Sequence, residues 1–166
     1  MPAPLVFVVH EHAATSLHYD FRLELDGVLL SWAVPKGPSL DPRHKRLAMR
    51  VDDHAISHGS FEGLYERGGA ILWDRGTWSA SEGRDARADL ARGRMSFVLH
   101  GEKLRGTWHL VRRAADKRES WVLFKGADSE ARRTGSITAD APKSVVSGMT
   151  LDELLATRHT PTDKPF

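Results

Sequence analysis

The 166-residue chain has no cysteine and no long hydrophobic run. Without cysteine there is neither a disulfide framework nor a thiolate metal site, and this composition suits a reducing compartment. The apolar run near the start, Leu5 to Val9, is too short for a membrane span or for the core of a signal peptide. We therefore expect a cytoplasmic protein with no membrane partner.

The chain also lacks a large net charge, since its formal charge is only +2. The charges are unevenly placed: residues 1–83 carry 8 Lys or Arg against 11 Asp or Glu, residues 84–133 carry 13 against 7, and the remainder carry 3 against 4. A basic middle segment could follow a nucleic-acid backbone. Solvated arginines on a helix and on hairpins would give the same count, so the charge alone does not identify a partner.

Length and patterning predict a single mainly β domain over residues 1–157 and a loose tail over residues 158–166. Strands are predicted at residues 5–9, 17–25, 28–34, 46–54, 70–74, 95–100, 104–112 and 120–125. Short helices are predicted at residues 85–92 and, behind a capping box that begins at Thr150, to about residue 157. About eight short strands separated by turns are typical of an antiparallel barrel or a sandwich.

The strand from Leu17 to Leu25 carries the first candidate site. Its odd-numbered residues are apolar, which is the period of a strand with one buried face. Its even-numbered residues are His18, Asp20, Arg22 and Glu24. Alternate residues of a strand stand roughly 6–7 Å apart, so His18 and Asp20 can share one divalent metal.

His12, six residues before His18, can return over the intervening turn as a third ligand. Two imidazoles and a carboxylate suit Mn, Fe, Zn, Co or Ni better than Ca or Mg. The alternative is an ordinary half-exposed strand face, although such a face would favour Thr, Lys, Ser and Glu over this set of residues.

Two further features predict an anion pocket beside the metal. Arg22 lies next to the proposed ligands on the same strand face and can hold a phosphate with its planar fork. The alternation over residues 46–54 places Arg46, Arg50, Asp52 and His54 together on one side of the strand. We expect His54 to bind phosphate and to donate a proton to the leaving oxygen, because imidazole exchanges protons near neutral pH. A charged outer face with one titrating histidine is the alternative.

The run from His12 to Leu25, followed by Leu30 to Ser39, resembles the 3′-phosphoesterase domain of bacterial DNA ligase D and its stand-alone relatives. The likeness covers nearly the whole chain. It continues through Lys45–Ala48, Val51–His54, Phe61–Gly63, Trp73–Trp78, Leu99–Gly106 and Ser144–Thr150. The resemblance implies a compact antiparallel β-barrel with short peripheral helices.

For function, the resemblance implies a manganese-dependent enzyme that heals DNA 3′ ends, with Co²⁺ or Zn²⁺ as other possible metals. Such enzymes remove a 3′-terminal ribonucleoside and then the 3′-phosphate, which leaves a 3′-OH for repair. The metal ligands carry over onto His12, His18 and Asp20. The phosphate contacts carry over onto Arg22 and His54, and the substrate contacts onto Lys36, Arg46 and Asp52.

The expected partners are DNA or RNA/DNA 3′ ends in a primer–template, with a ligase, a polymerase and Ku encoded separately, and the protein is expected to be a monomer. Two alternatives remain open at this point. One is a non-catalytic DNA-end-binding repair module with a vestigial metal site. The other is a phosphatase or nuclease of broader substrate range.

The chain departs from the family pattern outside the metal triad. His58 stands where a phosphate-contacting tyrosine is usual, so that contact either persists through the imidazole or is lost; His58 is kept with Arg22 and His54 as a catalytic candidate. Asp52 stands where glutamate is usual, and Ser16 replaces a basic residue. The segment between Gly63 and Trp73 is several residues shorter than the family's glycine-rich loop. These departures leave the choice of substrate more open than metal binding.

Overall fold

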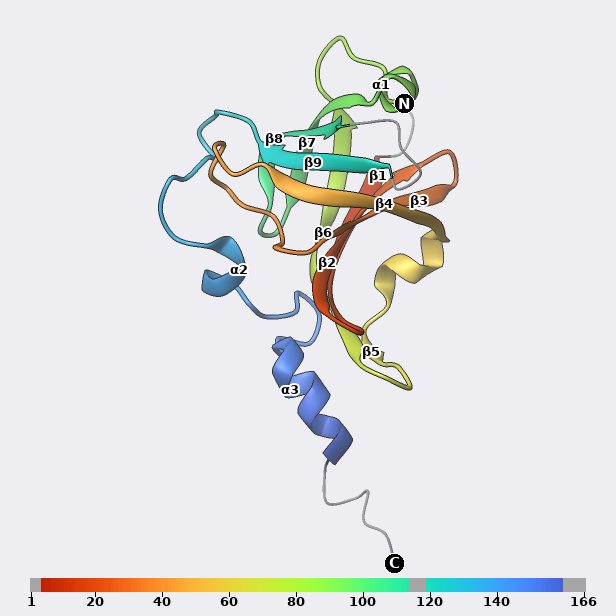
Figure 1. The fold of residues 1–166 in the computed structure, drawn as a ribbon, viewed down its shortest axis with the longest axis vertical. Coiled ribbons are helices and arrows are strands. Elements are labelled where there is room, and N and C mark those ends of the chain that lie inside the picture. Colours follow the sequence, from red (N-terminus) through yellow and green to blue (C-terminus); the bar gives the residue numbers. More distant parts are fainter. Residues whose placement is uncertain (1–3, 114–118, 160–166) are drawn as a thin grey trace, which may run out of the picture.

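Long antiparallel strands close into an eight-stranded barrel in the computed structural model, which describes residues 4–113 and 119–159 (Figure 1). The barrel strands are β1 (Leu5–Ala13), β2 (Leu17–Leu25), β3 (Val28–Val34), β4 (Arg46–Ala55), β6 (Gly69–Ala80), β7 (Arg94–Gly101), β8 (Arg105–Arg112) and β9 (Ser120–Lys125). Their order is β1-β2-β3-β4-β9-β8-β7-β6, and the pairing of β1 with β6 closes the barrel. The predicted antiparallel β-barrel is confirmed.

Local turn chemistry explains the hairpin that carries β2. Asp26 and Gly27 have φ angles of 53° and 82°, the left-handed pair that a tight two-residue hairpin turn requires and that Asp-Gly supplies. The turn fixes the register in which Arg22 lies opposite Ser31 and Asp20 lies opposite Ala33.

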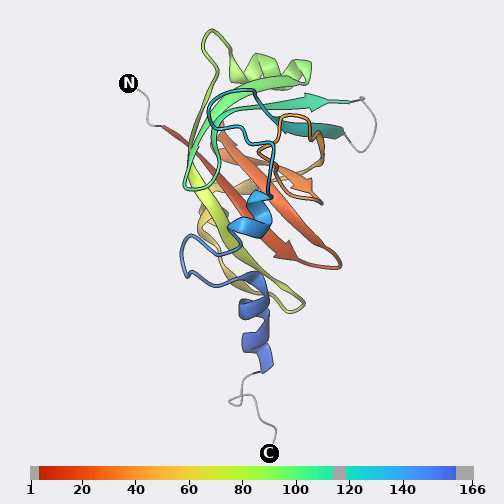
Figure 2. The same cartoon turned by 90° about the vertical axis from the view of Figure 1, so that its left-hand side faces the viewer.

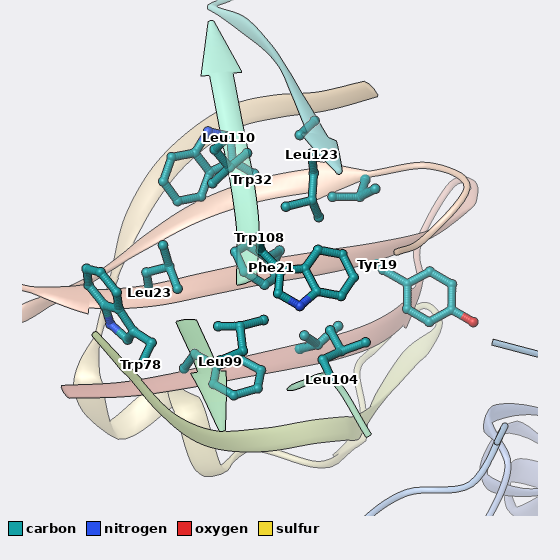
Figure 3. Close-up of a cluster of buried hydrophobic side chains, with 14 of the residues drawn as sticks. Tyr19, Phe21, Leu23, Trp32, Trp78, Leu99, Leu104, Trp108, Leu110 and Leu123 are labelled. Atoms are coloured by element: carbon teal, nitrogen blue, oxygen red, sulfur yellow. The ribbon is translucent and has the colours of Figure 1, made fainter. Parts of the chain in front are cut away.

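The barrel interior is filled by aromatic and aliphatic side chains. Figure 3 shows Phe21 and Leu23 of β2 pointing into the same interior as Trp32, Trp108 and Leu123 from other strands. All five are at most 1% exposed, and aromatic side chains of this size supply a large share of a core's burial energy. Because the inward face of β2 is fully used for packing, its alternate residues must lie on the outside of the barrel.

Short helices lie around the barrel. The helix α1 (Ala86–Arg92) lies at one end and α3 (Leu151–Ala156) beyond the other, in both Figure 1 and Figure 2. The remaining elements are the 3₁₀ helix η1 (Ile56–Ser60), the short strand β5 (Gly63–Leu64), α2 (Ile137–Asp140) and the 3₁₀ helix η2 (Thr157–His159). The capping box predicted at Thr150 is present, with Glu153 as its partner. None of the helices in the described ranges is long and apolar enough to cross a membrane.

Two strands run further than predicted. The first strand continues from Val9 to Ala13, so His10 and His12 lie inside it and not beyond its end. The strand predicted at residues 70–74 is continuous from Gly69 to Ala80, because β1 pairs with it along its length. Such non-local pairing is invisible in a local pattern.

The predicted arrangement of β4 was wrong in one respect. Ser31 lies opposite Val51 and Leu29 opposite His54, so β3 advances by two residues while β4 advances by three. This β-bulge at residues 52–53 moves His54 to the outer face, whereas Arg50 lies opposite the core residue Trp32. Because an extra residue reverses the alternation, His54 does not share a face with Arg46 and Arg50.

Candidate active site

The polar outer face of β2 forms the floor of a hollow of about 460 Å³. Residues of η1 and of the turn that follows β5 also border it. The hollow is lined by His12, His18, Asp20, Arg22, His54, His58, Tyr65 and Arg67. All six residues predicted as metal ligands or catalytic residues therefore meet in one place. Their assigned roles stay predictions.

The three predicted metal ligands lie within reach of one ion. His12 of β1 and His18 of β2 are direct cross-strand partners, and Asp20 follows on the same face of β2. His12 Nδ1 lies 3.2 Å from Asp20 Oδ2 and His18 Nε2 lies 3.1 Å from Asp20 Oδ1. One ligand atom from each residue lies within 4.8 Å of the others.

The two His–Asp separations fit ligands that share one metal ion. Two ligands bonded at about 2.1 Å to one ion stand about 3–3.4 Å apart in an octahedral or tetrahedral shell. The donor set of two imidazole nitrogens and a carboxylate is one that first-row transition ions accept. The side chains are partly accessible, at 23% for His12, 19% for His18 and 8% for Asp20, which leaves a path for an ion and a substrate oxygen.

The electrostatics keep Asp20 ionised. Burial alone would raise the pKa of Asp20, but hydrogen bonds from His12 and His18 and the charge of Arg22 outweigh it, so the pKa lies below its usual range. The hydrogen bond between His18 and Asp20 also raises the pKa of His18. A carboxylate that is anionic at neutral pH is the form that binds a cation.

Arg22 is the centre of the polar network. Its side chain is only 5% exposed. Its Nη1 donates to Ser31 Oγ at 2.8 Å and lies 3.0 Å from His54 Nδ1, while its Nη2 lies 3.3 Å from Asp20 Oδ2 and 3.5 Å from His58 Nε2. A buried guanidinium requires such partners to offset the loss of its hydration.

His10 completes the support of Arg22, and the sequence reasoning missed it. It is 1% exposed. Its Nδ1 accepts from Arg22 Nε at 3.3 Å and its Nε2 lies 3.0 Å from the carbonyl oxygen of Phe61, which fixes the tautomer with the proton on Nε2. Burial and the charge of Arg22 lower the pKa of His10 to about 4, so the ring is neutral. His10 and His12 are two residues apart on one strand and so share a face, which is the sequence signal that His10 belongs to the site.

His54 and His58 line the same hollow as the three predicted metal ligands. The β4 bulge orients His54, and η1 carries His58, with ring centroids 4.6 Å apart. His54 Nδ1 is also 3.1 Å from the backbone oxygen of Asp52. Burial, Arg22 and His54 lower the pKa of His58.

The three predicted substrate-binding residues lie elsewhere. Lys36 and Arg46 come together in a second hollow of about 490 Å³. It is lined by Pro35, Lys36, His44, Lys45, Arg46 and Leu47. The side chain of Asp52 is exposed at the β4 bulge. Only its backbone oxygen is connected with the first hollow, through the contact with His54 Nδ1.

Tyr65 and Arg67 are pocket residues that the sequence reasoning also missed. They belong to the turn between β5 and β6, the segment recognised only as shortened. Tyr65 stacks on Phe61 with ring centroids 5.0 Å apart, and Phe61 stacks on His58 at 5.8 Å. A Tyr-Glu-Arg turn carries no local signal for a pocket; its position becomes visible only when β5 pairs with β6.

Comparison with known proteins identifies the family of this chain. The model of the DNA Ligase D 3′-phosphoesterase domain matches residues 10–112. The chain is 46% identical over 169 residues to the multifunctional non-homologous end joining protein LigD of Pseudomonas aeruginosa, covering 97% of this chain and 20% of the relative.

Two mycobacterial relatives give the same result. The chain is 40% identical over 147 residues to the LigD repair protein of Mycobacterium tuberculosis, covering 86% of this chain and 19% of the relative. It is 37% identical over 136 residues to LigD of Mycolicibacterium smegmatis, covering 76% and 18%. The chain thus spans about a fifth of the length of these relatives. It belongs to the DNA ligase D 3′-phosphoesterase domain family.

Proposed function

We propose that this protein is a manganese-dependent phosphoesterase that heals DNA 3′ ends. It would remove a 3′-terminal ribonucleoside and then the 3′-phosphate, leaving a 3′-OH. The observation that carries the proposal is the meeting of a three-ligand metal group with Arg22, His54 and His58 in one hollow. Family membership supports a hydrolase with a role in end processing.

His12, His18 and Asp20 would hold the metal, with Mn²⁺ as the proposed ion and Co²⁺ or Zn²⁺ as substitutes. Three protein ligands leave open positions, and a bound ion would supply Lewis-acid polarisation of the phosphoryl group. The protein's own task here is to keep Asp20 ionised and both imidazoles directed at one point, which the contacts of Asp20 accomplish.

Arg22 would bind the phosphoryl oxygens beside the metal. Its longest contact, 3.5 Å from Nη2 to His58 Nε2, is the one that a phosphate oxygen can replace at least cost, since hydrogen bonds of this length are weak. The shorter contacts to Ser31 and His10 remain and hold the orientation of the fork. A hydrogen bond from the guanidinium to an anionic phosphate oxygen is stronger than one from the guanidinium to a neutral imidazole.

His54 would bind the phosphoryl group and give a proton to the leaving oxygen, with His58 as a second contact. Both side chains line the hollow and contact the guanidinium of Arg22. The lowered pKa of His58 favours its neutral form at pH 7, so we assign His58 a binding contact and not the role of proton donor.

Lys36 and Arg46 would contact the nucleic acid away from the reacting phosphate, since they line the second hollow with His44 and Lys45. Asp52 would act through the bulge that orients His54. We further propose that the protein acts as a monomer in the cytoplasm, on primer–template ends, alongside a separately encoded ligase, polymerase and Ku.

The test is an assay with a 5′-labelled DNA primer on a longer template, ending in either one ribonucleotide or a 3′-phosphate, with and without Mn²⁺. We expect both primers to be converted to the 3′-OH form when Mn²⁺ is present and not when metal is absent. We expect His18→Ala to abolish the conversion. His100→Ala is the matched control, because His100 is an exposed histidine outside the hollow.

Each other outcome has a definite meaning. Processing of the 3′-phosphate alone would remove the diesterase step from the proposal. No product from either primer, with DNA still bound in a salt-sensitive manner, would replace the enzyme by an end-binding module. Cleavage of substrates that have no 3′ terminus would indicate a broader phosphatase or nuclease.

A further inference from the structure

Tyr65 forms part of the wall of the metal pocket, although nothing in the local sequence marks it. Its ring centroid lies 5.3 Å from the ring of His12 and 5.0 Å from the ring of Phe61. The residue is partly buried and lines the same hollow as Arg22. Two packed neighbours thus restrict the ring beside a metal ligand.

Tyr65 lines the same hollow as Arg22 and Asp20, with its ring beside that of His12. A tyrosine hydroxyl is protonated at neutral pH, so it is a hydrogen-bond donor. An anion held by Arg22 beside the metal triad would be the natural acceptor, because charged acceptors form the stronger hydrogen bonds.

The backbone beneath Tyr65 is held by an arginine far along the chain. Arg158, in η2, donates from Nη2 to the carbonyl oxygens of Tyr65 at 2.6 Å and Gly68 at 2.9 Å, and from Nη1 to that of Glu66 at 3.2 Å. The predicted loose tail therefore begins with a residue that makes three contacts to the hairpin. One guanidinium thus binds three carbonyl oxygens of the same turn, which its planar set of N–H donors allows.

The turn is also pressed closely against β1. Gly68 has a φ of +85°, and a Cβ added there would lie 1.8 Å from the carbonyl oxygen of Ala13. Only glycine permits this approach. Since Ala13 follows His12, the same contact keeps Tyr65 beside the metal-binding strand.

We propose that Tyr65 is a substrate-contacting residue whose hydroxyl donates a hydrogen bond to an oxygen of the phosphoryl group bound by Arg22, and that Arg158 is its positioning residue. The inference rests on the proposed function insofar as the hollow must bind a phosphoryl group. It links the C-terminal helical segment to the site and gives the shortened hairpin a role.

The first test compares Tyr65→Phe, which keeps the ring, with wild type. Binding of inorganic phosphate to the Mn²⁺-loaded protein is measured by titration calorimetry, and kcat/KM is measured on the 3′-phosphate primer. We expect both affinity and kcat/KM to fall about 10- to 100-fold, the usual effect of losing a hydrogen bond to a charged group. Tyr19→Phe is the matched control, because Tyr19 is the other tyrosine and its hydroxyl contacts Glu11 and Thr138.

The second test concerns Arg158. Arg158→Ala should weaken phosphate binding and raise KM while leaving circular dichroism unchanged. Tyr65→Phe combined with Arg158→Ala should be no worse than the more impaired single variant, because both changes remove the same contact. A merely structural role for Arg158 would give additive losses.

The outcomes separate this inference from the proposed function. If wild type processes DNA ends and Tyr65→Phe equals it in phosphate affinity and kcat/KM, the inference is overturned and the function stands. If Tyr65→Phe is unaffected but Tyr65→Leu is impaired, the ring and not the hydroxyl matters, which also overturns it. If wild type binds phosphate but processes no ends, the function fails, and the loss of phosphate affinity in Tyr65→Phe still supports the inference.

Discussion

Replacing His10 tests whether the site depends on the support behind Arg22. His10→Leu keeps a side chain of similar bulk but removes both of its hydrogen bonds. Arg22 Nε and the carbonyl oxygen of Phe61 would then lose a partner, the first fully buried and the second partly. Each such buried group costs about 1–3 kcal/mol, and the partly buried carbonyl belongs at the low end. We therefore expect the free energy of unfolding to fall by about 3 kcal/mol.

His10→Gln provides the comparison, because its amide offers one acceptor and two donors in a flexible side chain. It should recover most of the loss and leave a deficit of about 1 kcal/mol. Urea unfolding followed by the fluorescence of the five tryptophans measures both variants. His100→Leu, an exposed change of the same type on β7, should stay within about 0.5 kcal/mol of wild type.

Activity should follow the same order. Without the bond to Nε the guanidinium can rotate away from the position beside Asp20, so kcat/KM for the 3′-phosphate primer should fall by about tenfold in His10→Leu and less in His10→Gln. If His10→Leu and His10→Gln were equally stable and equally active, the contacts of His10 would contribute nothing, and the account of Arg22 as a supported fork would be wrong.

Three other predictions follow from the geometry. Adding Mn²⁺ at about 100 times its dissociation constant should raise the Tm by about 5–10 °C, and calorimetry should show no rise for His18→Ala; an equal rise would place the ion elsewhere. Deleting Asp53 should remove the β4 bulge but keep His54 on the outer face opposite Leu29, because β4 would then advance by two residues between the flanking pairs, as β3 does; end processing should persist, and its loss would show that the bulge itself orients His54. Gly68→Ala should lower the Tm and the phosphate affinity together, because its Cβ meets the Ala13 carbonyl; an unchanged affinity would show that the hairpin does not hold Tyr65 in place.

The sequence predicted those parts of the fold that depend on local signals. The alternation of β2, the Asp26-Gly27 turn and the capping box at Thr150 all appear where they were expected. The pairing of β1 with β6 was not predictable, because it joins residues about 60 positions apart and depends on how the sheet curls closed.

The same distinction holds at the site. His18, Asp20 and Arg22 alternate on one strand, so their shared face could be deduced. His54 needed the bulge at residues 52–53, which reverses the predicted alternation on β4 and has no sequence signal of its own. The burial of His10 has no local signal, because its partners Arg22 and Phe61 come from other elements of the fold.

The hollow has a floor on β1 and β2 and walls on η1 and the β5–β6 hairpin. Departures from the family pattern have different consequences in these two parts. The floor stands on β1 and β2, whose inward side chains are core residues such as Val9 and Phe21, so its geometry is fixed by the packing that stabilises the barrel. The walls are η1 and the β5–β6 hairpin, short elements that are fixed by a few contacts such as those of Arg158. In the proposed function, changes at His58 and in the hairpin would therefore alter how a phosphoryl group is held and would leave the three proposed metal ligands in place. It follows that substitutions in the walls should change the ratio of diesterase to monoesterase activity, whereas substitutions on the floor should abolish both.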